Sequence, residues 1–373
     1  MTTDTWGVET YHVNVGNGDC SFHVLAYLAL KDRRVAWRCV LIDGGSAMSR
    51  VDPGTDTYQP HPVRQMIGFL TQTYEWPNSS NNRCQLDTIV ISHWDEDHYG
   101  ALLAMIKDDA AINKGVIDYL KYTDDGTTLR PATYFYVPNW AWGWQWPKLN
   151  GAPGKYINCD AAGYGSINIA YEGYKDTVVE HYVPFCMLRT ADPNLQGMSL
   201  GLVLGREFFF NKKCSVNVDQ VPNLAALVKA NPPQDPKIQP NDPLPPSMYC
   251  IAVMQRQLGP SPVGVIPDAK VTRTNRVSII CIIYWTDTKR ISHYLAGDAD
   301  DPTEVDTINW LIRSGVSKMT TMKLSHHGSR SSTPLGFLNA CNPQNIVMST
   351  PSSRHIHPCT FRVMAAVEMC FWY

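Results

Sequence analysis

The sequence lacks any apolar run of about eighteen residues, the length that a membrane-spanning helix requires, so we expect no membrane span. Its first residues also lack the basic start and the apolar stretch of a secretory signal peptide. The 11 cysteines are scattered and form no Cys-x-x-Cys, and several lie in apolar runs, where a small buried thiol is the usual interpretation. Together these absences predict a cytoplasmic protein.

Positive charge is not in excess either. The chain has 32 lysines and arginines against 34 aspartates and glutamates, which leaves a net charge of −2. Proteins that neutralise many phosphates usually carry a basic surface or stripe. We therefore expect no strong binding to duplex DNA, and only weak, strongly salt-dependent binding to long DNA.

What the sequence does contain is apolar material for a substantial core, with 44% hydrophobic residues among 373. Apolar runs alternate with helical patterns in two halves, which predicts an α/β fold. The first half is predicted to have strands at about 9–16, 20–28, 37–43, 86–91 and 133–137, and helices at about 61–74 and 98–107. From about 275 we predict a hairpin, helices near 303–314 and 333–340, strands at 319–325 and 345–349, and a closing helix.

Residues 92–98 are the most informative segment, because they read Ser-His93-Trp-Asp95-Glu-Asp97-His98 directly after the apolar run 86–91. A buried strand cannot solvate charged side chains along its length, but a tight loop at its end can aim several of them at one point. Two histidines and three acids at one strand end predict a metal site.

Other apolar runs also end in Asp or His at turns rich in glycine, at Asp43, Asp298 and His326. Ligand and catalytic residues of sheet-based enzymes collect at strand ends, so one shared site is expected. Isolated histidines are interpreted as ordinary surface or core residues: His12, His23 and His61.

The pattern His-x-Asp-x-Asp-His-x-Gly at 93–100 resembles the signature of the metallo-β-lactamase-fold hydrolases, which commonly have a histidine in place of Asp95. This departure resembles the branch typified by the soluble domain of the ComEC-type competence protein of DNA uptake. Further segments match that branch in chain order: 12–19, 40–45, 275–278 with 294–298, 323–329 and 357–358. The resemblance covers about 9–100 and 275–373.

The resemblance implies one metallo-β-lactamase-like domain over 1–373, an αββα four-layer sandwich with insertions at about 139–175 and 190–270. It also implies two divalent metal ions, Zn²⁺ or Mn²⁺. Asp95 hardens the first position and so favours Mn²⁺ or Mg²⁺ there, with zinc still plausible.

The implied ligands divide into two sets. His93 and Asp95 would hold the first metal, and Asp97 and His98 the second, with Asp298 as the bridge. His326 would complete the second set. His181 is proposed as the third ligand of the first metal, although water or a carboxylate could take its place.

Further roles follow from the same resemblance. Asp43 is expected to hydrogen-bond a ligand histidine. Asp97 would orient the nucleophile, while His357 and His327 could stabilise the substrate oxyanion or protonate the leaving group; His327 could equally be just a neighbour of the true ligand. Ser329 and Arg354 could bind a phosphate.

The function predicted is a dinuclear hydrolase that uses a metal-bound hydroxide, first of all a phosphodiesterase or nuclease-like enzyme acting on a small-molecule or nucleotide-type substrate. A second prediction is hydrolysis of a small ester, lactone or thioester. A non-catalytic binding protein that keeps the fold is a third, and the intact ligand set argues against it. The sequence leaves the oligomeric state open.

Two insertions carry features of their own. Residues 139–147 place four tryptophans at alternate positions, which favours either an aromatic wall for a substrate or a loop packed on its own domain. Residues 232–246 are rich in proline and are interpreted as an extended surface segment, with a lid as the alternative.

Overall fold

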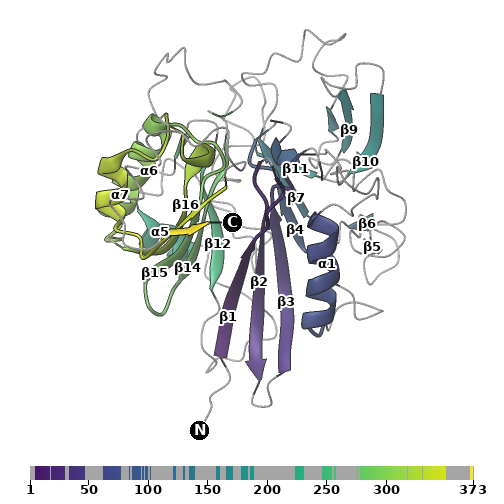
Figure 1. Ribbon diagram of the computed structural model, residues 1–373, viewed down its shortest axis with the longest axis horizontal. Helices are drawn as coiled ribbons and strands as arrows, with labels where there is room; N and C mark the ends of the chain where they lie inside the picture. The colour runs from purple at the N-terminus through teal and green to yellow at the C-terminus, as the bar shows by residue number, and fades with distance from the viewer. Residues whose placement is uncertain are drawn as a thin grey trace, which may run out of the picture.

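The computed structural model describes a set of segments spread over the whole chain: residues 5–16, 18–29, 33–46, 62–76, 84, 86–93, 95, 97–99, 101, 121–122, 129–130, 134–138, 157–159, 165–170, 178–183, 185–188, 223–230, 246–253, 256–257, 275, 278–316, 318–329, 331–349 and 370–372. Within these segments the protein is a mixed α/β structure built on two large sheets, as the sequence predicted. Both sheets can be followed in Figure 1.

The N-terminal sheet begins as an antiparallel meander and continues with parallel strands. Its strands lie in the spatial order β1 (Thr5–His12), β2 (Ser21–Ala29), β3 (Arg33–Ile42), β4 (Thr88–Val90), β7 (Tyr134–Pro138) and β11 (Phe185–Leu188). Because β3 and β4 run parallel, their carboxyl ends meet at one edge of the sheet.

The C-terminal sheet repeats this plan, with antiparallel strands followed by parallel ones. Its strands lie in the order β13 (Arg256–Gln257), β12 (Ser247–Val253), β14 (Ile280–Trp285), β15 (Arg290–Leu295), β16 (Met319–Lys323), β17 (Asn345–Met348) and β18 (Cys370–Trp372). Here too, β15, β16 and β17 are parallel, so their carboxyl ends share an edge.

Two small sheets lie between β4 and α5 in the sequence. One contains β10 (Val178–Val183), β9 (Gly165–Ala170) and β8 (Ile157–Cys159), and the other contains β5 (Lys121–Tyr122) and β6 (Leu129–Arg130). The chain then returns to the N-terminal sheet at β11, which pairs with β7. The tryptophan-rich segment 139–147 and all but the last residue of the proline-rich segment lie outside the described residues.

The described helices are α1 (Pro62–Thr73), α5 (Leu224–Ala230), α6 (Asp301–Arg313) and α7 (Leu335–Cys341). On α1 the buried residues Val63, Ile67 and Leu70 recur at helical spacing and form one apolar face. Asp300 caps α6 by accepting from the Thr303 backbone N–H at 3.3 Å. None of the helices in the described segments is long and apolar enough to cross a membrane.

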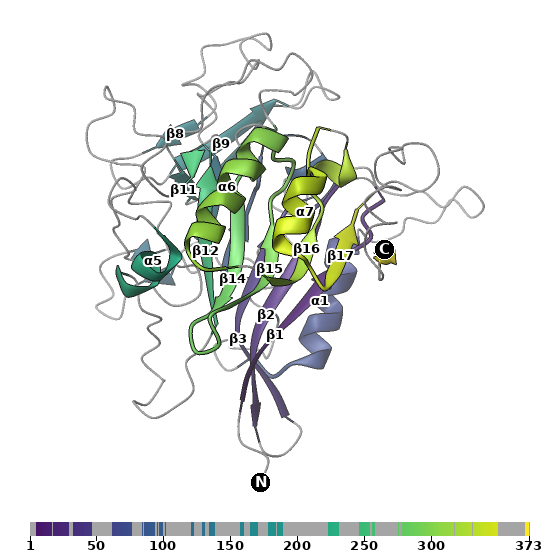
Figure 2. The ribbon, with the colours of Figure 1, turned by 90° about the vertical axis from the view of Figure 1, so that its left-hand side faces the viewer.

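The two large sheets pack against each other through a shared apolar core. Leu25, Val40 and Val90 of the N-terminal sheet belong to the same buried cluster as Ile282 and Met322 of the C-terminal sheet. Figures 1 and 2 show α6 and α7 on the outer side of the C-terminal sheet, and α1 beyond the N-terminal sheet.

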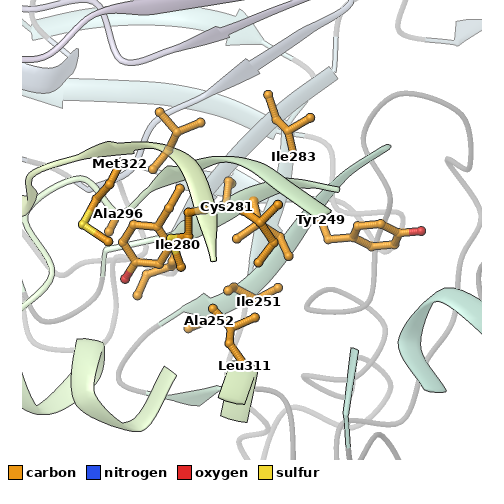
Figure 3. Packing of buried hydrophobic residues seen from close by; sticks show 14 of the residues in the cluster. Tyr249, Ile251, Ala252, Ile280, Cys281, Ile283, Ala296, Leu311 and Met322 are labelled. Atoms are coloured by element: carbon orange, nitrogen blue, oxygen red, sulfur yellow. The ribbon is translucent and has the colours of Figure 1, made fainter. Parts of the chain in front are cut away.

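Strand β14 lies at the centre of this core. Residues 280–283 are all at most 1% exposed, because one face of the strand meets the other sheet and the opposite face meets the helices. Figure 3 shows Ile280 and Cys281 packed among side chains that include Leu311 of α6. Burying each such aliphatic side chain contributes about 1.5–3 kcal/mol, so the core stabilises the strands whose ends carry the site.

The predicted elements are found with shifted ends. The strand predicted at 9–16 is β1, which ends at His12, and the helix predicted at 61–74 is α1. Residues 97–99 and 101 are helical, while the rest of the helix predicted at 98–107 lies outside the described residues. The final described element is the strand β18, and residues 350–369, where a closing helix was predicted, are outside the description.

Candidate metal centre

The loop that follows β4, residues 92–98 (the β4 loop), is tied to two neighbouring loops by backbone hydrogen bonds. Gly44 N donates to the carbonyl of His98 at 2.7 Å, and Asp19 N donates to that of Asp97 at 3.2 Å. Gly18, with φ +94°, sits so close that an added Cβ would lie 1.6 Å from the Asp97 carbonyl oxygen. Glycine is therefore required at this position for the loops to meet.

Asp298 lies at the centre of the site, three residues after β15, and is 3% exposed. Its Oδ1 is 3.3 Å from His98 Nε2 and 3.7 Å from His327 Nε2. Its Oδ2 is 3.8 Å from His93 Nε2 and 3.7 Å from His326 Nε2. The carboxylate thus faces two pairs of histidines with its two oxygens, the position expected of a bridging ligand.

The loop after β16, residues 324–329 (the β16 loop), places two adjacent histidines in this centre. His326 and His327 both have left-handed backbones, with φ of 47° and 54°. Such conformations cost about 1–3 kcal/mol each and persist where the surroundings enforce them. Here His326 N donates to the carbonyl of Gly297 at 3.0 Å.

Glu304 of α6 restrains the same loop from behind. It is fully buried and accepts from the Ser325 hydroxyl at 2.5 Å and from the Thr333 backbone N–H. Burial raises the pKa of Glu304 to about 8, although the hydrogen bonds from Ser325 and Thr333 oppose the shift. These contacts hold the loop in its strained shape.

The distances divide the side chains into two ligand groups that share Asp298. In the first ligand group, His93 Nε2 lies 3.5 Å from Asp95 Oδ2. His93 and His326 both face Oδ2 of Asp298. The second ligand group contains Asp97, His98 and His327, with 3.4 Å between His327 Nε2 and Asp97 Oδ2.

The two histidines of the β16 loop lie the other way round from the sequence prediction. His326 was predicted beside Asp97 and His98, but His327 occupies that place and His326 lies beside His93. Their rings stand 67° apart because consecutive left-handed residues direct their side chains to different sides of the turn.

Four ligand-type atoms of this centre are buried without a hydrogen-bond partner among the described residues: His93 Nε2, His98 Nε2, His327 Nε2 and Asp298 Oδ1. Leaving one polar group unsatisfied costs about 1–3 kcal/mol, and such groups are rare enough to need an explanation. In both His93-His98-Asp298 and Asp97-His98-His327 the ligand atoms lie within 4.8 Å of one another. This donor set fits divalent metal ions.

Asp43 supports histidines from both ligand groups. Its Oδ2 accepts from His98 Nδ1 at 2.9 Å, which is the contact expected from the sequence. The same oxygen accepts from the Ser92 hydroxyl at 2.6 Å, and Ser92 Oγ lies 3.0 Å from His93 Nδ1. Because Nδ1 is engaged in both rings, each Nε2 is left to act as a ligand.

Asp19 and Lys323 belong to the site, although sequence reasoning gave them no role. Buried Asp19 pairs with the buried Lys323 ammonium and accepts from the Ser349 hydroxyl. It also lies 3.4 Å from His327 Nδ1, which donates to the Ser349 carbonyl at 2.9 Å. The available signal was position: Asp19 and Lys323 stand at the ends of two of the matched motifs.

Negative charge dominates the centre. Burial disfavours the charged form of His98, but Asp298, Asp43 and Asp97 outweigh it and raise the His98 pKa well above its ordinary value. Burial is likewise outweighed at His327, where Asp298 and Asp19 raise the pKa to about 10. Such a site attracts cations, and a divalent metal on these nitrogens would take the place of the protons.

Four predicted residues lie apart from these contacts or outside the description. His181 is on β10, in a separate sheet, and its side chain lies outside the description, as do Arg354 and His357. Ser329 closes the β16 loop, where its N–H donates to the His326 carbonyl at 2.8 Å. The roles proposed for these residues stay predictions.

Compared with known proteins, the chain matches no protein-family model and no curated sequence.

Proposed function

We propose that this protein is a hydrolase that uses two divalent metal ions, first of all a phosphodiesterase or nuclease-like enzyme. The observation that carries the proposal is the convergence of three histidine nitrogens and Oδ1 of Asp298, all buried and without a hydrogen bond among the described residues. Burying imidazole nitrogens and a carboxylate oxygen without hydrogen bonds is costly, and metal ions would supply the missing partners.

The charge of the site supports two cations rather than one. With neutral histidines, the described ionised groups leave a net charge of −4, which two divalent ions would balance: Asp19, Asp43, Asp95, Asp97 and Asp298 against Lys323. The first ion would be held by His93, Asp95 and His326, the second by Asp97, His98 and His327, and both by Asp298. When bound, such ions lower the pKa of water and polarise the oxygen under attack.

The exposed side of the centre indicates where a substrate would approach. The His93 and His98 side chains are 0% exposed, whereas those of Asp95 and Asp97 are 34% and 25% exposed. Water and substrate would therefore reach the centre past these two carboxylates and His326, whose side chain is 30% exposed. Asp95 and Asp97 are the groups placed to orient an attacking water, while the buried histidines keep the ions fixed.

The fold supports the same proposal. We propose that the two facing sheets, with α1 on one outer side and α6 and α7 on the other, form the αββα four-layer sandwich of a metallo-β-lactamase-like protein. The ligands follow β4, β15 and β16, as expected of a site built on the carboxyl ends of parallel strands. Five cysteines whose side chains the structure describes are free, buried thiols, which suits the proposed reducing cytosol: Cys20, Cys39, Cys84, Cys281 and Cys341.

Hydrolysis of bis-p-nitrophenyl phosphate by protein loaded with Mn²⁺ tests this function. We expect turnover that chelation abolishes and added Mn²⁺ restores, with two ions bound per chain by elemental analysis. Asp298→Asn is the matched control, because it keeps the shape of the side chain but removes the bridging charge. Turnover of lactones or thioesters alone would contradict the substrate class, and a chain that binds no metal would contradict the proposal itself.

A further inference from the structure

Asn275 lies in the centre but belongs to no ligand set predicted from the sequence. It is 2% exposed and sits in the turn that leads into β14. Its carbonyl accepts from Ser278 N at 3.1 Å, and the next residue, Ile279, donates to the Ser92 carbonyl at 2.9 Å. This turn is therefore fastened directly to the β4 loop.

The amide of Asn275 faces the first ligand group. Its Nδ2 is 3.4 Å from Asp298 Oδ2 and 3.4 Å from His326 Nε2. Those are the same two atoms that, with His93 and Asp95, define the first ligand group. Rotating an amide by 180° exchanges its oxygen and nitrogen without changing its shape, and the orientation is decided by its surroundings.

A cation in the first ligand group would reverse the preference of this amide. Without a cation, the N–H group suits the acceptors Asp298 and His326. Next to a cation, an N–H donor is repelled, while the amide oxygen is a good ligand for hard ions. The amide thus offers an oxygen where His93 and His326 supply only nitrogens.

We infer that the side-chain oxygen of Asn275 is a ligand of the first metal ion, in the role for which the sequence suggested His181. This inference rests on the proposed two-metal function. Three oxygen-bearing residues (Asp95, Asp298 and Asn275) then join two histidines. The first position is then rich in the oxygen ligands that Mn²⁺ prefers.

The test measures Mn²⁺ stoichiometry and affinity by equilibrium dialysis with elemental analysis in the full-length chain. Asn275→Ala removes the oxygen, and we expect one tightly bound ion in place of two, with first-position affinity lowered by at least about tenfold. Asn275→Asp restores an oxygen but not the N–H donor, and we expect two ions again. Circular dichroism and thermal melting check that each variant folds.

Ser278→Ala is the matched control, because the Ser278 hydroxyl lies in the same turn and accepts from the backbone N–H of Asp298 at 3.2 Å, but it offers no ligand to the first ligand group. We expect this variant to bind two ions. Wild-type stoichiometry and affinity in Asn275→Ala would overturn the inference. Weakened Mn²⁺ binding in Asn275→Asp would also overturn it, since the amide would then act only as a donor to Asp298. If Asn275→Ala does not fold, the result for Asn275→Asp decides.

Failure of the proposed function gives a different result. If the wild-type chain bound no Mn²⁺, both proposals would be wrong. If it bound two ions and hydrolysed the phosphodiester while Asn275→Ala behaved identically, only the role of Asn275 would be wrong.

Discussion

The β4 loop and the β16 loop bring ligand atoms to the same centre but hold them in different ways. The β4 loop ends in an ordinary helical turn, where His98 N donates to the Asp95 carbonyl at 3.0 Å. The β16 loop has two left-handed histidines in succession and depends on Glu304, a residue of another element. The first loop therefore closes on a local helical turn, whereas the second keeps a strained backbone that a residue of α6 holds from behind.

The largest expected effect comes from removing one histidine ligand at a time from the two loops. His98→Ala and His327→Ala should lose the same metal ion, and His93→Ala and His326→Ala should lose the other one. Turnover should fall in each case by more than the roughly 100-fold that follows loss of a residue that only orients a ligand. Metal content and the affinity of the remaining ion distinguish the pairs. If His326→Ala instead matched His98→Ala, the grouping by distance would be wrong and the sequence prediction right.

Next in size is the buried ion pair at the base of the β16 loop. Lys323→Met removes the ammonium that pairs with the buried Asp19 carboxylate and leaves His327 and His98 as its ionisable neighbours. We expect a loss of at most about 3–5 kcal/mol in the free energy of unfolding. Urea unfolding measures it. The double variant with Asp19→Asn should lose less than Lys323→Met alone, because the unpaired charge is then gone. Equal losses in the single and double variants would contradict this account of the pair.

A smaller effect is expected from the support of the β4 loop. Asp43→Asn removes the charge that orients His98 directly and His93 through Ser92. Since one histidine from each ligand group depends on Asp43, the affinity for both ions should fall by about 10–100-fold. Titration of the metal-free protein with Mn²⁺ measures both affinities. Weakening at one position alone would show that the chain through Ser92 does not matter.

The last prediction is a pH dependence of stability that originates at Glu304, behind the β16 loop. The pKa of Glu304 is raised to about 8 from an ordinary 4.5, so the folded protein keeps a proton that the unfolded chain releases. Between these values stability should fall as pH rises, by at most about 1.4 kcal/mol per pH unit. Glu304→Gln cannot titrate and should lack this slope.

Urea unfolding of wild type and Glu304→Gln at pH 5, 6, 7 and 8 isolates the contribution of Glu304, because the other titrating groups are common to both proteins. Parallel curves would mean that Glu304 is ionised in the folded state at all these values.

The sequence by itself determined the parts of this protein that depend on short-range patterns. Apolar runs that end in Asp or His predicted β4, β15 and β16 and placed Asp298 and His326 at their ends. The β4 loop could be predicted almost completely, since four ligand-type residues stand within six positions of one another and a helical turn brings them together. The hydrogen bond of Asp43 to a histidine was likewise expected and is present.

The tertiary structure alone decided the remaining features of the site. Lys323 and Asp19 are 304 residues apart and meet only because β16 and the turn before β2 end at the same place. Asn275 joins the centre through the turn before β14, and His327 rather than His326 faces Asp97 because Glu304 and Gly297 hold a left-handed backbone. Local patterns report burial and period, whereas these contacts depend on how distant strand ends pack, and no pattern within one segment encodes that.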